Sequence, residues 1–194
     1  MKISNLTSSC RFMRILPVGI AIALTGLAST SCNSDLPDDD TAEWNTRNVA
    51  FLEEQEALTE NGERAYTKIS PDWAPSAFVL MRWHNDRSLT ASNLQPLDNS
   101  TCYVKYELED IEGTVLQNSY DMQTYGDSIY RCRPSDNIVG FWVALRNMHV
   151  GDSVTVIIPA AAGYGASSSG KVRAYSTLVY HLMLKGVPAF ETPK

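Results

Sequence analysis

A glycine-rich loop with a single tyrosine, set between two apolar strands, is the part of this 194-residue chain where chemistry is most to be expected. Residues 150–165 read VGDSVTVIIPAAAGYG, and residues 174–186 read AYSTLVYHLMLKG. Both contain the alternation of apolar residues that is typical of a half-buried strand. Gly163-Tyr164-Gly165 is too short to cradle a phosphate. We therefore interpret the loop as one side of a ligand pocket.

The other reactive side chains do not form a recognisable catalytic or metal-binding set. His84, His149 and His181 are isolated in the sequence, and the separation of Cys102 and Cys132 fits no zinc motif. The acidic residues are scattered, with no pair placed for glycoside hydrolysis. We expect neither a metal nor a cofactor.

Residues 1–31 have the pattern of a lipoprotein signal peptide. Three basic residues precede the apolar run 15–28, which is short for a membrane span, and small residues then lead to Cys32. A cysteine in this place resembles the bacterial lipoprotein signal, in which the thiol is acylated and becomes the mature N-terminus. Ser29 stands where such signals usually have leucine, and an ordinary secretory signal that is cleaved nearby is the alternative.

Residues 32–41 form an acidic tether, which resembles the surface-export signal of lipoproteins in Bacteroides-like bacteria. We expect a lipid anchor at Cys32 that holds the protein in the cell envelope, at the outer membrane. Because of the acidic tether, we also expect that the protein is exposed on the cell surface. The sequence says nothing of the oligomeric state.

The charge of the mature chain argues against a nucleic-acid partner. Removal of residues 1–31 takes away three basic residues and no acidic one, which leaves 13 basic and 22 acidic residues and a net charge of −9. Phosphates dominate nucleic-acid affinity and would be repelled. Small molecules or proteins remain as partners.

The elements that must position the pocket can be predicted from hydrophobic periodicity. Residues 42–74 comprise a helix over 42–60, with Trp44, Phe51 and Leu58 at seven-residue intervals and Asn61-Gly62 as its stop, and then a linker. This helix packs on the body or on a partner helix. The pattern beyond it predicts a helix over 140–148 and strands over 78–83, 101–109, 129–132, 154–158 and 178–184. Half-buried strands with one short covering helix indicate an α+β domain with an antiparallel sheet.

Six motifs, in order, carry a resemblance to a known family. They are TCYVKY ending at Tyr106, Gly113, Ile138-Val139-Gly140-Phe141, Met148-His149-Val150-Gly151, Tyr164-Gly165 and Thr177-Leu178-Val179-Tyr180. Residues 75–187 thus resemble the FKBP family of peptidyl-prolyl cis-trans isomerases. The segment 42–74 looks like the extra segment of FKBP-type lipoproteins from Bacteroides-like bacteria, and residues 188–194 form a tail. The implied fold is a twisted antiparallel sheet wrapped around one short helix.

The resemblance assigns roles to the pocket residues. Phe141 takes the place of the family's pocket-floor tryptophan, Ile138 offers its N–H to a substrate carbonyl, and the Tyr164 hydroxyl bonds a second carbonyl. Tyr106 and Tyr180 form walls. The implied substrates are proline-containing polypeptides, whose imide bonds have rotation barriers of about 18–20 kcal/mol. No bond is broken in this reaction, so it needs no nucleophile or metal.

Departures from the family pattern bear on the activity. The family's Phe-Asp pair is Leu116-Gln117 here, and Gln117 can accept a hydrogen bond from the Tyr106 hydroxyl only as a neutral amide. Ser128 replaces an aromatic wall. We expect a wetter, wider pocket and weak isomerase activity.

The flap reads Lys171-Val172-Arg173-Ala174 in place of the family's apolar, proline-rich sequence. Leu116, Val172 and Tyr175 are the substrate-binding residues that the resemblance implies there.

The family's strand pairing places Tyr130 opposite Val104, and therefore Cys102 opposite Cys132. Export allows a disulfide between them, whereas strained cross-strand geometry or a reducing niche leaves two free thiols.

Three functions remain. An isomerase that assists the folding of exported proteins is favoured by Tyr164 and Phe141. A non-catalytic FKBP-like binding or chaperone module is favoured by Gln117 and Ser128. The acidic tether permits a surface lipoprotein that serves assembly.

Overall fold

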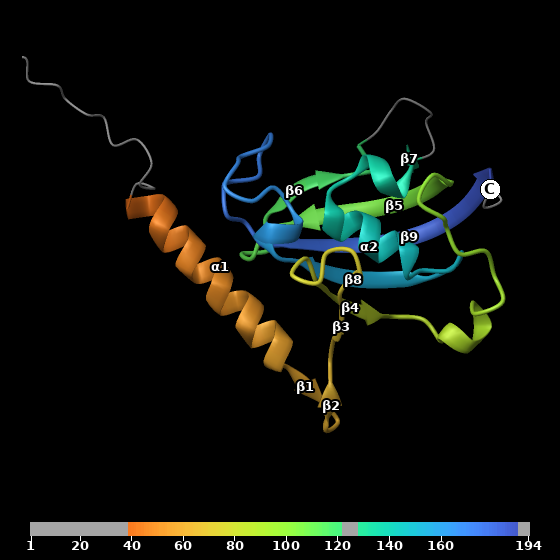
Figure 1. Cartoon of the computed structure of the whole chain (residues 1–194), viewed down its shortest axis with the longest axis horizontal. Coiled ribbons are helices and arrows are strands. Elements are labelled where there is room, and N and C mark those ends of the chain that lie inside the picture. The colour runs from red at the N-terminus through yellow and green to blue at the C-terminus, as the bar shows by residue number, and fades with distance from the viewer. Residues whose placement is uncertain (1–38, 122–127, 190–194) are drawn as a thin grey trace, which may run out of the picture. The chain divides into compact units, whose positions relative to one another are not determined.

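Alternating apolar residues build a seven-stranded antiparallel sheet in the computed structural model, which describes residues 39–121 and 128–189. The predicted signal peptide, Cys32 and the tail beyond 189 lie outside the described residues. The strands are β3 (Thr67–Ile69), β4 (Val79–Trp83), β5 (Thr101–Glu109), β6 (Val115–Asn118), β7 (Tyr130–Cys132), β8 (Ser153–Ile158) and β9 (Leu178–Ala189). Their order is β3-β4-β8-β9-β5-β6, and β7 pairs with β5 (Figure 1).

The central strands follow the predicted alternation. In β5 the side chains of Cys102, Val104, Tyr106 and Leu108 are buried, while the residues between them are partly exposed. β9 lies between β5 and β8 and buries every second residue from Leu178 to Leu184. The period of two in the sequence therefore predicted both strands and their inward faces.

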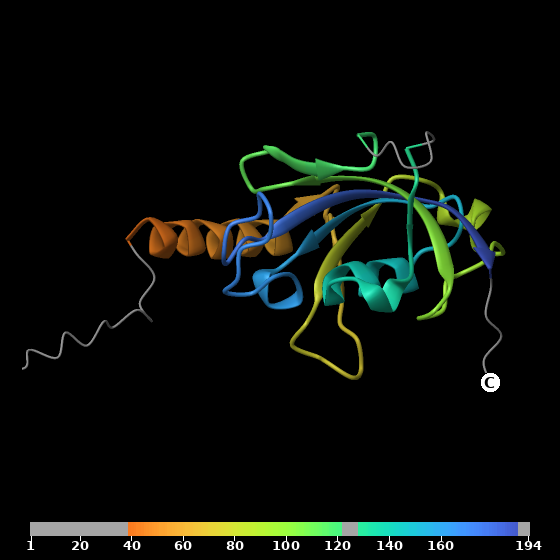
Figure 2. The ribbon, with the colours of Figure 1, turned by 90° about the horizontal axis from the view of Figure 1, so that it is seen from above.

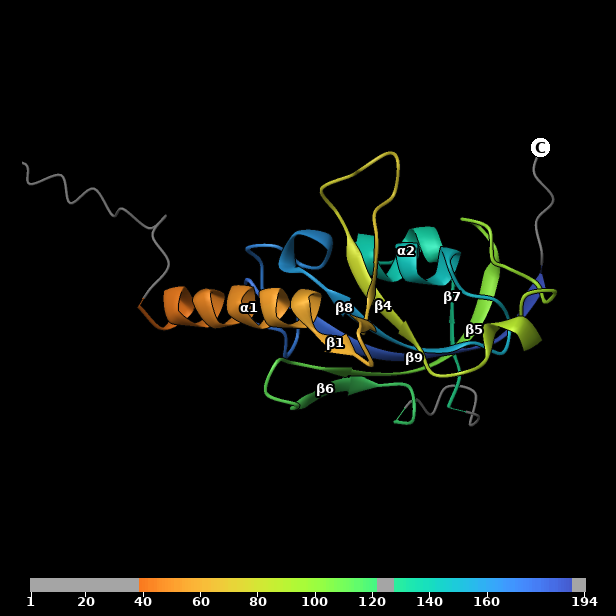
Figure 3. The same ribbon diagram turned by 90° about the horizontal axis from the view of Figure 1, so that it is seen from below.

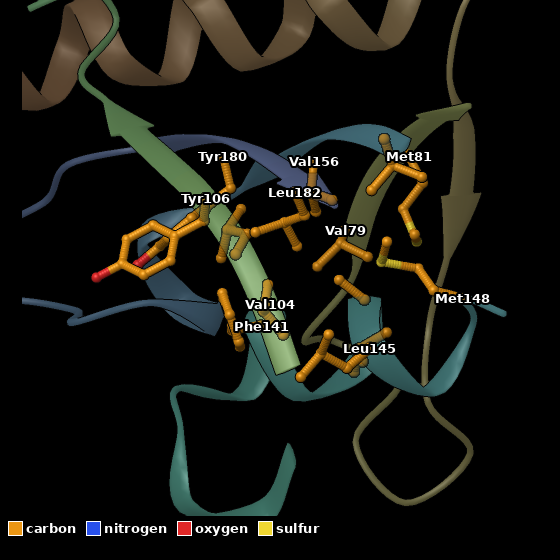
Figure 4. Packing of buried hydrophobic residues seen from close by; sticks show 14 of the residues in the cluster. Val79, Met81, Val104, Tyr106, Phe141, Leu145, Met148, Val156, Tyr180 and Leu182 are labelled. Atoms are coloured by element: carbon orange, nitrogen blue, oxygen red, sulfur yellow. The ribbon is translucent and has the colours of Figure 1, made fainter. Parts of the chain in front are cut away.

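The short helix α2 (Val139–Arg146) covers the inner face of the curved sheet, as Figure 2 shows. Its residues Phe141, Ala144 and Leu145 are buried against the sheet, together with Met148 just beyond its end. Figure 4 shows Phe141, Leu145 and Met148 on the side of Val79, Met81, Val104 and Val156, which come from the strands. The predicted α+β fold, an antiparallel sheet with one short helix and an N-terminal helix, is confirmed.

The N-terminal segment differs in part from the prediction. Helix α1 spans Asp39–Ala57 and ends before Asn61-Gly62, which closes a small hairpin of β1 (Thr59–Glu60) and β2 (Glu63–Arg64). Asn61 and Gly62 have φ angles of 52° and 85°, as the tight turn of a two-residue hairpin requires. Asn-Gly thus acts as a hairpin turn, and its interpretation as the helix stop was wrong. None of the helices described is long and apolar enough to cross a membrane.

Three further 3₁₀ turns shape the connections, at Arg87–Leu89, Pro134–Asp136 and Ala160–Ala162. The loop of residues 70–77 lies on the same side of the sheet as α2 (Figure 3), where Trp73 stacks on Trp142 with ring centroids 4.8 Å apart.

A buried carboxylate fastens the long 85–99 loop to the turn before β8. Asp152 is fully buried and accepts hydrogen bonds from Thr90 Oγ1 (2.5 Å), Asn85 Nδ2 (3.0 Å) and the His149 N–H (2.8 Å). Burial alone would raise the pKa of this carboxyl, but the three donors, with the Arg87 charge, outweigh burial and lower it.

Asp152→Asn is expected to lower the free energy of unfolding at pH 7 by about 2–3 kcal/mol, because the amide loses one buried acceptor. Because the folded pKa is lowered, the carboxylate's contribution is present above pH ~4 and is lost as the pH falls through the folded pKa. Urea unfolding at pH 7 and pH 3 should therefore show a larger difference between wild type and variant at pH 7. The exposed Asp72→Asn is the control, and an equal loss at both pH values would contradict the account.

Candidate active site

An aromatic cavity of about 320 Å³ opens between the inner face of the sheet and the start of α2. This volume falls in the range of small-ligand pockets. Its lining combines side chains from β5, β6, β7, β9, α2 and two loops: Tyr106, Gln117, Tyr130, Asp136, Asn137, Ile138, Phe141, Tyr164 and Tyr180. All six residues predicted as catalytic are brought together here.

The walls are rings that meet edge to face. Phe141 contacts Tyr180 with ring centroids 5.3 Å apart and Tyr106 at 6.3 Å, while Tyr130 contacts Tyr106 at 5.4 Å. Phe141, Tyr106 and Tyr180 are each 5% exposed or less, so the floor is dry and its rings are fixed by packing. Such a surface removes water from a bound apolar segment.

Two hydrogen bonds with Ser119 hold the Tyr106 backbone in register at the end of the β5–β6 pairing. Ser119 accepts a bond from the Tyr106 N–H at its Oγ (3.0 Å), and its own N–H donates to the Tyr106 carbonyl (2.9 Å). Ser119 is fully buried, so this pair of bonds is shielded from water. The Tyr106 ring is therefore directed into the cavity by a serine two residues beyond Gln117.

Two hydrogen-bond donors that line the cavity have no acceptor among the described residues. Ile138 precedes the first turn of α2, where backbone N–H groups lack helical partners, and its N–H donates no bond within the described part of the chain. The same is true of the Tyr164 hydroxyl among the residues that the structure covers. Tyr164 sits in a tight loop: Gly165, at φ 61°, donates its N–H to the Ala160 carbonyl (2.9 Å). Both donors are thus available to carbonyl groups of a ligand.

A second cavity of about 350 Å³ adjoins the first one and shares Gln117 and Tyr164 with it. Leu116 and Val172, which were predicted to bind substrate, line this second cavity. Tyr175 lines neither cavity; it lies in the flap, half-buried. A polypeptide longer than a few residues can therefore extend from the aromatic cavity toward the flap.

The sequence of residues 93–185 matches the family model of FKBP-type peptidyl-prolyl cis-trans isomerases. Among solved structures, the chain is similar to a peptidyl-prolyl cis-trans isomerase from Pseudomonas syringae pv. tomato, with 20% identity, a TM-score of 0.59 and coverage of 78% of this chain and 96% of the other. It is also similar to FkpA from Escherichia coli, with 22% identity, a TM-score of 0.60 and coverage of 78% of this chain and 62% of FkpA. A search of curated proteins found no match.

Residues 93–185 form an FKBP-type peptidyl-prolyl cis-trans isomerase domain. The match assigns these residues to a family of isomerases that act on proline-containing polypeptides. The two solved structures share its fold, and the aromatic cavity lies within the matched residues.

The tyrosine hydroxyls that line the FKBP pocket of this chain are neutral donors. Burial raises the pKa of Tyr180, Tyr106 and Tyr130 above the usual tyrosine value, and the neighbouring tyrosines add to the rise. These hydroxyls therefore stay protonated at physiological pH. Among the described residues, no group of three or more His, Cys, Asp or Glu side chains could hold a metal ion.

Within the described residues, Gln117 and the Tyr106 hydroxyl do not form the hydrogen bond that the sequence predicted. Gln117 is exposed where the two cavities meet, and its uncharged amide gives the Tyr106 hydroxyl no strong acceptor. Ser128 does not line the aromatic cavity. The departure at Gln117 thus leaves a polar, solvent-facing side of the FKBP pocket.

Sequence reasoning missed three lining residues of the FKBP pocket. Tyr130 faces Tyr106 across the β5–β7 pairing, and its hydroxyl donates to Asn137 Oδ1 (3.0 Å). Asp136 and Asn137 reach the rim because the 3₁₀ turn at Pro134–Asp136 folds them back. The predicted register of Tyr130 opposite Val104 was a usable signal for the first of these, whereas the turn left no periodic pattern.

The FKBP domain's two cysteines lie opposite each other, as the predicted register required, and both thiols are free. Burial raises the pKa of each thiol to about 12, and for Cys132 the nearby Cys102 adds to the rise. Thiolates are therefore scarce at neutral pH.

Alkylation with iodoacetamide at pH 8 should leave Cys102 and Cys132 unmodified in the native protein and label both after unfolding in urea. Peptide mapping by mass spectrometry measures the labelling of each site, and intact mass with and without reductant measures the disulfide. Fast native labelling, or a mass that rises by two hydrogens on reduction, would contradict free thiols of raised pKa.

Proposed function

We propose that this protein is an isomerase that assists the folding of exported proteins, with a rate reduced by Gln117. The observation that carries the proposal is the pair of unused donors, the Ile138 N–H and the Tyr164 hydroxyl, at a cavity walled by aromatic rings. A proline-containing segment would place its ring on Phe141 and its flanking carbonyls on these two donors. Family membership supports the substrate class.

The proposed mechanism works by solvation and positioning. A planar imide is more polar than the twisted one because resonance separates charge across the C–N bond. The dry ring walls therefore favour the twisted state over the planar one. The Ile138 N–H and the Tyr164 hydroxyl hold the carbonyls on either side, so that rotation proceeds about one bond. Each tenfold of acceleration needs about 1.4 kcal/mol, which a few such contacts supply.

The proposed reduction in rate follows from the missing negative charge at Gln117. A carboxylate beside the Tyr106 hydroxyl would accept a charge-assisted hydrogen bond, whereas Gln117 offers a neutral acceptor. Such bonds differ by about 1 kcal/mol, which corresponds to about a fivefold difference in rate.

Gln117→Asp is expected to raise kcat/KM about fivefold, and Tyr164→Phe to lower it five- to tenfold because one hydrogen bond to substrate is lost. The measurement is proline-limited refolding of a reporter protein, with Gln117→Ala as the matched control for the site. A wild-type rate equal to the uncatalysed rate would overturn the catalytic proposal.

A non-catalytic binding module is the second candidate, favoured by the neutral, solvent-facing side of the pocket at Gln117. In the same assay it would suppress aggregation of the reporter without changing the proline-limited rate. Tyr164→Phe would then weaken peptide binding while the refolding rate stayed at the uncatalysed value.

We also propose that Cys32 carries a lipid that anchors the mature protein in the cell envelope, with the outer membrane and the cell surface as its location. The pattern of residues 1–31 and the acidic tether support this proposal. Export would bring the domain into contact with newly translocated chains, and a lipid would keep it there.

Cys32→Ala is expected to abolish incorporation of radiolabelled palmitate and to shift the protein from the membrane to the soluble fraction. Cys10→Ala is the matched control, because Cys10 lies within the signal peptide. Unchanged labelling and fractionation in Cys32→Ala would favour an ordinary secretory signal instead.

A further inference from the structure

We propose that helix α1 is a latch that holds the substrate flap, residues 165–177, in its binding conformation, with Trp44 and Asn48 as the positioning residues. The inference rests on the proposed use of the pocket for proline-containing substrates. Figure 1 shows the loop between β8 and β9 beside the first turns of α1.

Asn48 is the centre of the latch. It is a polar side chain on a helix, yet it is only 1% exposed. Its Oδ1 accepts a hydrogen bond from the Thr177 N–H (2.7 Å), and its Nδ2 donates to the Trp44 carbonyl (2.8 Å). The Thr177 hydroxyl also donates to the Asn48 carbonyl (3.4 Å). A buried amide with both ends paired fixes the residue from which β9 and Tyr180 begin.

Trp44 holds the preceding residues of the flap. It is 3% exposed, and its Nε1–H donates to Ser176 Oγ (3.0 Å). The Arg173 guanidinium lies over the Trp44 ring at 4.6 Å from its centroid and also bonds Asp40 Oδ2 (2.7 Å). Helix α1 therefore contacts the flap at Arg173, Ser176 and Thr177.

The backbone of the flap has an uncommon conformation, which contacts from outside the flap stabilise. Tyr175, which lies between the flap residues that contact α1, has φ 60°, an uncommon conformation for a residue with a large side chain. Its N–H donates to the Gly165 carbonyl (2.8 Å), which ties the two ends of the flap together next to Tyr164. Within the flap, the one bridge described is Ser169 with Val172. Few backbone bonds order the flap from within, so the contacts with α1 stabilise its conformation.

The consequence is preorganisation of the substrate site. Tyr164, at the base of the flap, lines both cavities, and Val172 lines the second one. If the latch is released, a substrate must order the flap when it binds, and this cost weakens affinity. Phe141, Tyr106 and the Ile138 N–H lie away from the flap and from Thr177, so we expect them to be unaffected.

The test uses Asn48→Ala in the full chain. We expect KM for a proline peptide to rise about tenfold, which corresponds to about 1.4 kcal/mol, with kcat changed less than twofold. Hydrogen exchange of the Tyr175 and Thr177 amides should accelerate by at least the same factor. Thr46→Ala is the matched control, because Thr46 is on the exposed side of α1 and its hydroxyl bonds only the Ala42 carbonyl. It should leave both readouts unchanged.

A second, milder variant keeps the proposal testable if Asn48→Ala does not fold. Trp44→Phe retains a buried ring but loses the bond to Ser176, so it should raise KM and exchange, and adding Ser176→Ala should change neither further. Unchanged KM and unchanged exchange in Asn48→Ala, or in Trp44→Phe, would overturn the latch. If the wild-type protein shows no catalysis, the proposed function is wrong. The hydrogen-exchange rates of the Asn48→Ala variant still test the latch in that case.

Discussion

The approach of α2 to β8 at Gly140 is the contact on which the pocket depends. A Cβ atom on Gly140 would lie 2.2 Å from Ile158 Cγ2, so only glycine allows the helix to rest on the strand at this point. Because the first turn is held there, Phe141 faces the sheet as the pocket floor. The unpaired N–H of Ile138 is placed just outside the helix, at the edge of the same cavity.

The sheet supplies the opposite half of the cavity, and loops supply its variable parts. Tyr106 and Tyr180 come from adjacent central strands whose alternation is set by core burial, so their rings are held by the fold itself. Gln117, Tyr164 and Val172 come from β6 and from loops, and Gln117 is exposed, so its substitution costs little stability. In this chain the residues that fix the frame and those that tune the chemistry are therefore separate.

The sequence predicted what burial controls, and it missed what local turns and polar contacts control. The inward residues of β5 and β9 and the position of α2 were predictable because one face of each element is buried. The pairing of Cys102 with Cys132 was predictable only from the resemblance to the FKBP family. The hairpin at Asn61-Gly62 was missed because the same dipeptide ends helices and closes hairpins, and no short-range pattern separates these outcomes. Asn48 gave no signal, since a polar residue on a helix is ordinarily exposed. Its burial depends on Thr177, which is distant in sequence.

The central claim is that the Ile138 N–H and the Tyr164 hydroxyl bind the carbonyls of a proline-containing segment over Phe141. The most direct measurement is an NMR titration of the ¹⁵N-labelled protein with a short proline-containing peptide and with the same peptide carrying alanine in place of proline. The account predicts that the proline peptide shifts the Ile138 amide resonance downfield, together with resonances of Gly163 and Gly165 beside Tyr164, and that the alanine peptide shifts them far less. Equal shifts with both peptides, or shifts confined to residues outside the aromatic cavity, would contradict it.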